Sequence, residues 1–186
     1  MNLFILDLDP VVAASYHNDT HVTKMLLEAC QILCTAHHVH NPNQYEIPYK
    51  IAHLNHPCTK WVRETKANHE WALKLARALC IQYTYRTGKL HKCTAVVDWL
   101  EQKLDQIAWS NVNLTPFVLA MPDRYQCSDP VLSYRLYHQS EKRGYWRKIR
   151  NSKLSTWYPY KFSKVIKPTW IDVSFDIGPH SIKIAS

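Results

Sequence analysis

The sequence predicts a mainly α-helical, single-domain bundle with a short extended segment at the N-terminus and a basic, aromatic arm at the C-terminus. Two features of composition favour this class: 46% of the 186 residues are hydrophobic, which is enough for a core, and the chain contains only three glycines. The third observation is that apolar side chains recur at the helical interval of three and four residues over long stretches. We expect the helical, catalytic-like domain to occupy residues 1–150 and the arm to occupy residues 151–186.

Proline, asparagine and glycine mark where the predicted helices begin and end. Residues 2–9 alternate weakly, which predicts a short buried strand or an extended lead-in, and Asp9-Pro10 is a typical helix start. A long central helix is predicted from Pro10 to about residue 36, and further helices over 59–87, over 94–108 and from Ser128 to about residue 146. Residues 41–57 and 109–128 are expected to be loops, and residues 171–186 are expected to be extended.

The predicted central helix is apolar around most of its circumference, apart from one narrow polar stripe. The stripe consists of His17, His21, Lys24, Glu28, Gln31 and Thr35. Imidazole, ammonium and carboxylate groups in consecutive turns can transfer protons or attack an electrophile near neutral pH. We therefore expect the stripe to line a functional cleft, with His17, His21, Lys24 and Glu28 as catalytic candidates. Two simpler interpretations stay open: a solvated strip, and a Lys24–Glu28 ion pair on the helix surface.

The excess positive charge of the chain is concentrated near its C-terminus. Nine basic residues and no acidic residue lie between Lys142 and Trp170, which leaves 14 basic residues against 15 acidic ones elsewhere. Lysine and arginine neutralise phosphates, and interleaved aromatic rings provide surfaces on which bases stack. We therefore expect a nucleic acid as partner, with DNA favoured; an arm whose rings pack on the core is the alternative. The candidate contacts are Arg63, Arg86, Lys89, His91, Lys142, Arg143, Trp146, Arg147, Lys148, Arg150 and Trp157.

Two sets of residues contain metal-ligating side chains. His17 and His21 form an HxxxH pair, but Asn18 stands where the metalloprotease motif has its glutamate. The other set is irregularly spaced and comprises Cys34, His37, His38, His40, His53, His56 and Cys58. We expect no metal and no cofactor, and a metal-dependent nuclease or nucleotide hydrolase that uses His17 and His21 stays open as an alternative.

Cysteine usage and hydropathy indicate the compartment. The six cysteines contain no CxxC pair and lack the density of a secreted disulfide scaffold, so we expect reduced thiols and a cytoplasmic location. The first residues have no basic region and no small-residue cleavage site, which argues against a signal peptide. The longest uncharged apolar run is too short to span a bilayer, so no membrane partner is expected.

Several blocks of the sequence resemble a family of small proteins encoded by bacteriophages and large viruses. The blocks are MNLFILDLDPVVAASYHNDTHVTKMLLEACQILCTAHH, NHPCTKWVRET, QYTYRTGKLHK, TPFVLAMPDRY and DPVLSYRLYHQSEKRGYWR, in this order over about residues 1–150. This family is loosely similar to the phage pyrimidine-dimer DNA glycosylase. The resemblance implies a single helical domain that acts on DNA through an N-terminal amine as Schiff-base nucleophile, a glutamate on a helix, and arginine and histidine residues near the DNA.

The resemblance leaves the nucleophile open. His17 falls at a comparable place early in the first helix, whereas Glu28 comes about one turn later than the enzyme's glutamate and Lys24 occupies the nearer position. The amine is therefore either that of Lys24 or that of the N-terminus. We expect a DNA-acting enzyme in the cytoplasm of a host cell: a pyrimidine-directed DNA glycosylase, with or without lyase activity. A non-catalytic viral nucleic-acid-binding protein is the main alternative.

Overall fold

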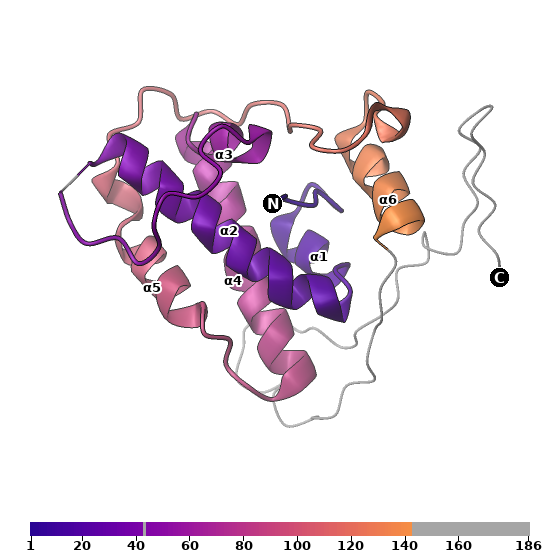
Figure 1. The fold of residues 1–186 in the computed structure, drawn as a ribbon, viewed down its shortest axis with the longest axis horizontal. Coiled ribbons are helices and arrows are strands. Elements are labelled where there is room, and N and C mark those ends of the chain that lie inside the picture. Colours follow the sequence, from indigo (N-terminus) through magenta and orange to yellow (C-terminus); the bar gives the residue numbers. More distant parts are fainter. Residues whose placement is uncertain (43, 143–186) are drawn as a thin grey trace.

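The computed structural model describes residues 1–42 and 44–142, and these residues form a compact helical fold (Figure 1). The helices are α1 (Pro10–Ser15), α2 (Asp19–His40), α3 (Pro57–Val62), α4 (Lys66–Thr87), α5 (Thr94–Gln102) and α6 (Pro130–Glu141), with two short 3-10 turns, η1 (Leu104–Gln106) and η2 (Asp123–Tyr125). The described part of the chain contains no strand, so residues 2–9 form a lead-in. The predicted fold class is confirmed; the predictions for the arm at 151–186 concern residues outside the described ranges.

The two long helices, α2 and α4, pack against each other at the centre of the fold, with α1 lying on α4 (Figure 1). Small and aliphatic side chains supply the buried faces, because they allow close packing of neighbouring helices. Ala29 and Leu33 of α2 and Ala72 and Leu79 of α4 are fully buried. This pair is the frame on which α3, α5 and the N-terminal segment are placed.

The N-terminal segment is buried although it is not helical. Leu3 and Leu6 expose 2% and 0% of their surface and belong to the core. Two side chains fix the segment through its backbone: Arg135 of α6 donates to the Leu6 carbonyl at 2.9 Å, and Trp71 of α4 donates to the Leu8 carbonyl at 2.8 Å. The first residues therefore lie between α2 and α6 (Figure 1).

The predicted central helix is interrupted after Ser15, so the prediction of one continuous helix from Pro10 is wrong. Asn18 causes the break, because its Oδ1 accepts a hydrogen bond from the His21 N–H at 2.9 Å and its backbone is extended, which is typical of a residue that starts a new helix. As a result, His17 lies between α1 and α2 rather than on the helix that contains His21.

The other predicted helices need smaller corrections. The helix expected over 59–87 is divided at residues 63–65, where Thr65 caps α4 by accepting from the Asn68 N–H at 3.1 Å. Gly88 ends α4 in the left-handed backbone conformation, with φ 71°, which is typical of a glycine after a helix. The helix expected over 94–108 ends at Gln102 and continues as η1.

α6 begins as predicted and ends earlier than predicted. The Asp129 carboxylate accepts from the Val131 and Leu132 N–H groups and starts the helix at Pro130, and α6 ends at Glu141 instead of near residue 146. No helix among the described residues combines the length and the apolar character needed to cross a bilayer.

Candidate functional site

A cleft of about 240 Å³ lies where the N-terminal segment, α2 and the end of α6 meet. Its lining residues are Met1, Asn2, Phe4, His21, Lys24, Met25, Glu28, Tyr137 and Lys142. His21, Lys24 and Glu28 are members of the predicted polar stripe and follow one another on one face of α2. The stripe therefore faces a cleft through these three residues.

Glu28 is joined to the N-terminal segment. The Asn2 backbone N–H donates to Glu28 Oε2 at 2.8 Å, and the Met1 amine nitrogen lies 3.7 Å from the same oxygen. Asn2 is itself fixed, because its side-chain amide donates to the Ala120 carbonyl at 2.7 Å and its Oδ1 lies 3.2 Å from the Tyr134 hydroxyl. These contacts place an amine and a carboxylate at a defined position in the cleft.

Lys24 contributes a second amine to the same cleft. Its side chain is exposed, and among the described residues Glu28 forms an ion pair with the Met1 amine but none with Lys24. The surface Lys24–Glu28 ion pair that the spacing allows is therefore not formed. Lys24 remains free to contact a ligand in the cleft.

The His21 imidazole lines the cleft, and the buried imidazoles of His17 and His138 lie near the His21 ring. The ring centroid of His21 is 6.5 Å from that of His17 and 5.0 Å from that of His138. Burial lowers the pKa of His17 to about 3 and that of His21 to about 4, and it lowers the pKa of His138 as well. All three rings are therefore neutral at pH 7 and act there as hydrogen-bonding groups.

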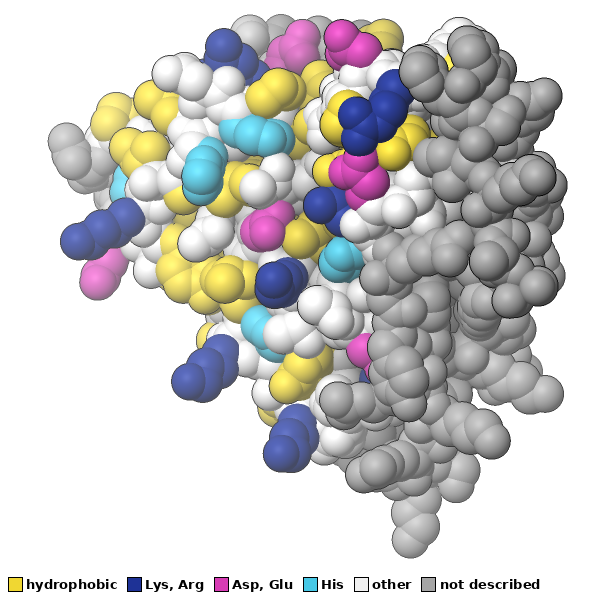
Figure 2. Space-filling model, turned by 45° about the vertical axis from the view of Figure 1, so that its right-hand side comes forward, with side chains coloured by type: hydrophobic (Ala, Val, Ile, Leu, Met, Phe, Trp, Pro, Cys, Tyr) yellow, Lys and Arg dark blue, Asp and Glu magenta, His cyan; other side chains and the backbone are white. Residues whose placement is uncertain are grey.

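The end of α6 forms the opposite side of the cleft. Lys142 Nζ lies 5.2 Å from the centroid of the Tyr137 ring, and the Asn18 side chain donates to the Lys142 carbonyl at 2.9 Å. Among the described residues that line the cleft, Lys24, Lys142 and the Met1 amine are basic and Glu28 is the one carboxylate, which favours an anionic ligand. Figure 2 shows basic, acidic and histidine side chains interspersed with hydrophobic ones on one face of the molecule.

The metal alternatives find no support in the geometry. His17 is fully buried, and its Nδ1 donates to the Ala13 carbonyl at 2.8 Å. His38 and His40 donate to backbone carbonyls through Nε2, and His56 Nδ1 accepts from the Cys58 N–H. Within residues 1–42 and 44–142, no three histidine, cysteine or acidic side chains are arranged to bind one metal ion.

Arg86 was predicted to contact phosphates, whereas the structure places it inside the protein. Its side chain is only 2% exposed, and the guanidinium donates to Gln82 Oε1, to the carbonyls of Ser15 and His17 and to the Asp19 carboxylate. Burial lowers the pKa of Arg86, and the Asp19 carboxylate opposes that shift. Arg86 thereby fixes the break between α1 and α2.

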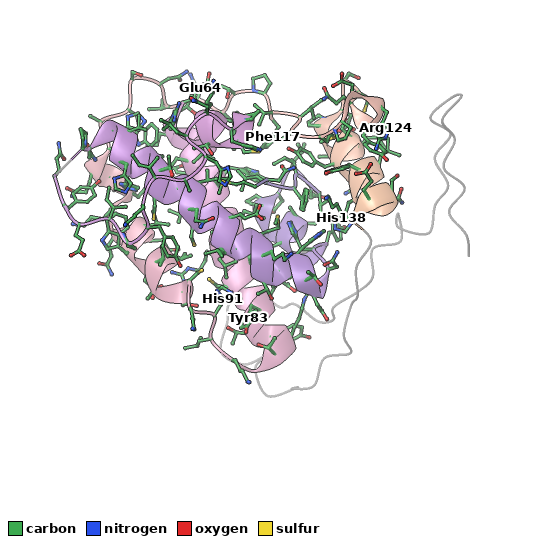
Figure 3. All side chains as sticks on the ribbon, viewed as in Figure 1. Glu64, Tyr83, His91, Phe117, Arg124 and His138 are labelled. Carbon is green, nitrogen blue, oxygen red and sulfur yellow. The ribbon has the colours of Figure 1, made fainter. Side chains whose placement is uncertain are left out.

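Three of the remaining predicted contacts, namely Arg63, Lys89 and His91, are not among the residues that line the cleft. Arg63 is at the end of α3, where it donates to the Leu54 carbonyl at 2.9 Å, and Lys89 is exposed beyond α4. The His91 ring packs edge-on against Tyr83 at 4.7 Å, and both residues are labelled in Figure 3. The residues predicted near the start of the arm, namely Arg143, Trp146, Arg147, Lys148, Arg150 and Trp157, lie outside the described ranges.

Comparison of the chain with family models, with curated protein sequences and with solved structures finds no match. The assignment of a function therefore depends on the residues and on the geometry of the cleft.

The sequence analysis missed His138, Tyr137 and Asn2 as parts of the site. His138 follows Tyr134 by one turn on the buried face of α6, and a histidine on a buried helix face was the available signal. No local signal marks Asn2, because its partners are more than 20 residues away in sequence.

Proposed function

We propose that the protein acts on DNA as a pyrimidine-directed glycosylase that uses an amine of the cleft as its nucleophile. The observation that supports this most directly is the placement of two amines, those of Met1 and Lys24, in one cleft with the Glu28 carboxylate. An amine that attacks a sugar carbon needs a base to accept its proton, and the departing pyrimidine needs a proton donor. The resemblance of the sequence to viral proteins that are similar to a DNA glycosylase supports the same class.

The proposed reaction uses groups that the cleft contains. The amine nitrogen bonds to C1′ of the deoxyribose while the bond from C1′ to the pyrimidine breaks, and the base leaves with that electron pair and takes up the first amine proton, which Glu28 accepts and passes on. Opening of the sugar ring, with transfer of the amine proton to O4′, gives a Schiff base. Glu28 is placed to accept and return the amine proton, and elimination of the 3′ phosphate from the Schiff base would add lyase activity.

Access to the base requires that the pyrimidine leave the stack and enter the cleft. The rings of Phe4 and Tyr137 line the cleft and provide surfaces on which a flipped base can pack. Lys142, together with Lys24 if the Met1 amine is the nucleophile, would contact the flanking phosphates. Lys89 and the basic residues beyond Lys142 would then bind DNA further from the cleft.

Trapping with borohydride tests this proposal. The purified protein is incubated with duplexes that contain a pyrimidine dimer, a 5-modified pyrimidine or an abasic site, with and without borohydride, which reduces a Schiff base to a stable adduct. An adduct mapped by mass spectrometry to Met1 or to Lys24 is the expected result. Lys24→Ala abolishes the adduct if Lys24 is the nucleophile and preserves it if the Met1 amine is. Lys50→Ala, at an exposed lysine outside the cleft, is the matched control.

A non-catalytic nucleic-acid-binding protein is the second candidate. It is favoured by the nine basic residues without an acidic one between Lys142 and Trp170. This candidate predicts DNA that is bound in a strongly salt-dependent way and recovered intact, with no adduct and no released base.

A further inference from the structure

The Asn18 side chain determines which nitrogen of His21 has the proton. Asn18 Oδ1 accepts the His21 backbone N–H at 2.9 Å, which fixes the orientation of the amide and makes its nitrogen a donor on the other side. This NH2 group donates one hydrogen to the Lys142 carbonyl at 2.9 Å, and its nitrogen lies 3.1 Å from His21 Nδ1. Because Nδ1 accepts the second hydrogen, it is unprotonated.

His138 contacts the same nitrogen of His21 from α6. Its Nε2 lies 3.1 Å from His21 Nδ1, and since that atom is unprotonated, the hydrogen between the two rings belongs to His138. Figure 3 shows His138 on the side of α6 that faces α2. Burial of both rings, and for His21 also the nearby charges of Lys142 and Lys24, opposes protonation. His21 is therefore neutral and has its proton on Nε2.

We propose that His138 is a positioning residue, which holds His21 in the neutral Nε2–H tautomer so that the cleft offers an N–H donor to its ligand. His21 lines the cleft, and within the described ranges its Nε2 has no hydrogen-bond partner. A pyrimidine presents carbonyl oxygens, and these accept a hydrogen bond from Nε2–H but would be repelled by an unprotonated Nε2. The choice of a pyrimidine carbonyl as the acceptor rests on the proposed function, whereas the tautomer does not.

His17 has the opposite tautomer to His21, because the partner of its Nδ1 is an acceptor. His17 Nδ1 donates to the Ala13 carbonyl, so its proton lies on Nδ1, and its ring is buried away from the cleft. An unrestrained imidazole exchanges between the two tautomers, and the cleft would then present a donor during only part of the time. Asn18 Nδ2 and His138 Nε2 share the single lone pair of His21 Nδ1 in a three-centre hydrogen bond, and both contacts favour the tautomer in which Nδ1 is unprotonated.

Nitrogen NMR of the histidine rings in the full chain tests this inference, because it distinguishes protonated from unprotonated ring nitrogens. We expect His21 of the wild type at neutral pH to be protonated on Nε2 only. His138→Gln replaces the imidazole by an amide N–H donor and should keep this tautomer. His138→Phe keeps a ring without a donor and should give a mixture of tautomers. The matched control is His69→Phe, because His69 is a fully buried imidazole of α4 that contacts His37 and Trp109 instead of His21.

Adduct formation gives the second readout. His138→Phe should slow trapping by about tenfold, less than the loss caused by complete removal of an oriented donor, and His138→Gln should restore the rate. An Nδ1–H or doubly protonated His21 in the wild type would overturn the inference even if His138→Phe does not fold. An unchanged His21 tautomer in a folded His138→Phe variant would also overturn it. If the tautomers follow the expected pattern and no DNA gives an adduct, the inference stands and the proposed glycosylase function fails.

Discussion

The backbone N–H of Asn2 and the carboxylate of Glu28 are joined by a 2.8 Å hydrogen bond between the N-terminal segment and the middle of α2. Because Asn2 is also bonded to Ala120 and lies next to Tyr134, the position of the Glu28 carboxylate depends on three separate parts of the chain. The cleft is thus a product of the whole fold rather than of α2 alone.

Glu28→Gln should abolish most of the adduct formation and leave the fold intact. The glutamine oxygen can still accept the Asn2 N–H, and the lost ion pair with the Met1 amine is partly exposed, so the free energy of unfolding should fall by about 1 kcal/mol or less. The trapping rate should fall by about 10²-fold or more, because the proton acceptor is lost. Single-turnover trapping and urea unfolding measure the two effects. Glu46→Gln, at an exposed position, should change neither, and a wild-type trapping rate in Glu28→Gln would exclude the proton-transfer role.

Arg86→Met should destabilise the protein without weakening DNA binding by the molecules that remain folded. Removal of the guanidinium breaks its hydrogen bonds to the Asp19 carboxylate and to the carbonyls of Ser15 and His17, which should cost about 3–5 kcal/mol of unfolding free energy. Chemical unfolding and fluorescence anisotropy with labelled DNA measure the two quantities. Lys89→Met is the comparison, because Lys89 is exposed and should affect binding rather than stability. Weaker binding by folded Arg86→Met at unchanged stability would support the original phosphate-contact interpretation.

Stability should fall as the pH is lowered from about 6.5 toward about 4. Burial lowers the pKa of His17 to about 3 and those of His21 and His37 to about 4, so the unfolded chain binds protons in this range that the folded chain does not. The stabilisation is fully present above the unfolded pKa and is lost as the pH falls, by up to about 1.4 kcal/mol per pH unit for each ring. Urea unfolding across this range measures the slope. His21→Gln should make it shallower, and the exposed control His53→Gln should not.

Asn18→Ala should lower both stability and activity, whereas Thr65→Ala should lower stability alone. Both residues cap a long helix through a side-chain oxygen, and loss of either cap should cost about 1 kcal/mol. Asn18 additionally bonds Lys142 and His21 at the cleft, so its removal should also slow trapping. Equal trapping rates in the two variants, after correction for the folded fraction, would show that Asn18 is only a helix cap.

Hydropathy periodicity predicted the helical class because most of α2, α4 and α6 is amphipathic or buried in the expected phase. It failed at Asn18 and at Thr65, where a side chain caps the following helix. Each break is only a few residues long, so the apolar residues on either side still follow the helical spacing. As a result, the prediction placed His17 on the same helix face as His21, whereas His17 lies between α1 and α2.

The candidate site could be predicted only where it is local. Three and four residues separate His21, Lys24 and Glu28 on one helix, so their common face follows from spacing. His138 lies 117 residues from His21, and no local pattern in the sequence predicts that α6 packs beside α2. Arg86 was misplaced for a related reason: a basic residue near a helix end is usually exposed, and its burial depends on Ser15, His17 and Asp19.

The hydrogen bonds from Asn2 to Ala120 and from Asn18 to Lys142 also determine when the N-terminal residues can reach their final contacts during synthesis. Synthesis releases the N-terminal residues first, yet their partners leave the ribosome only after more than 100 further residues have been added. Until then Leu3 and Leu6 have no complete core to enter, and the Met1 amine and Glu28 are not positioned by the rest of the chain. A chain that ends before Lys142 therefore lacks contacts that assemble the cleft.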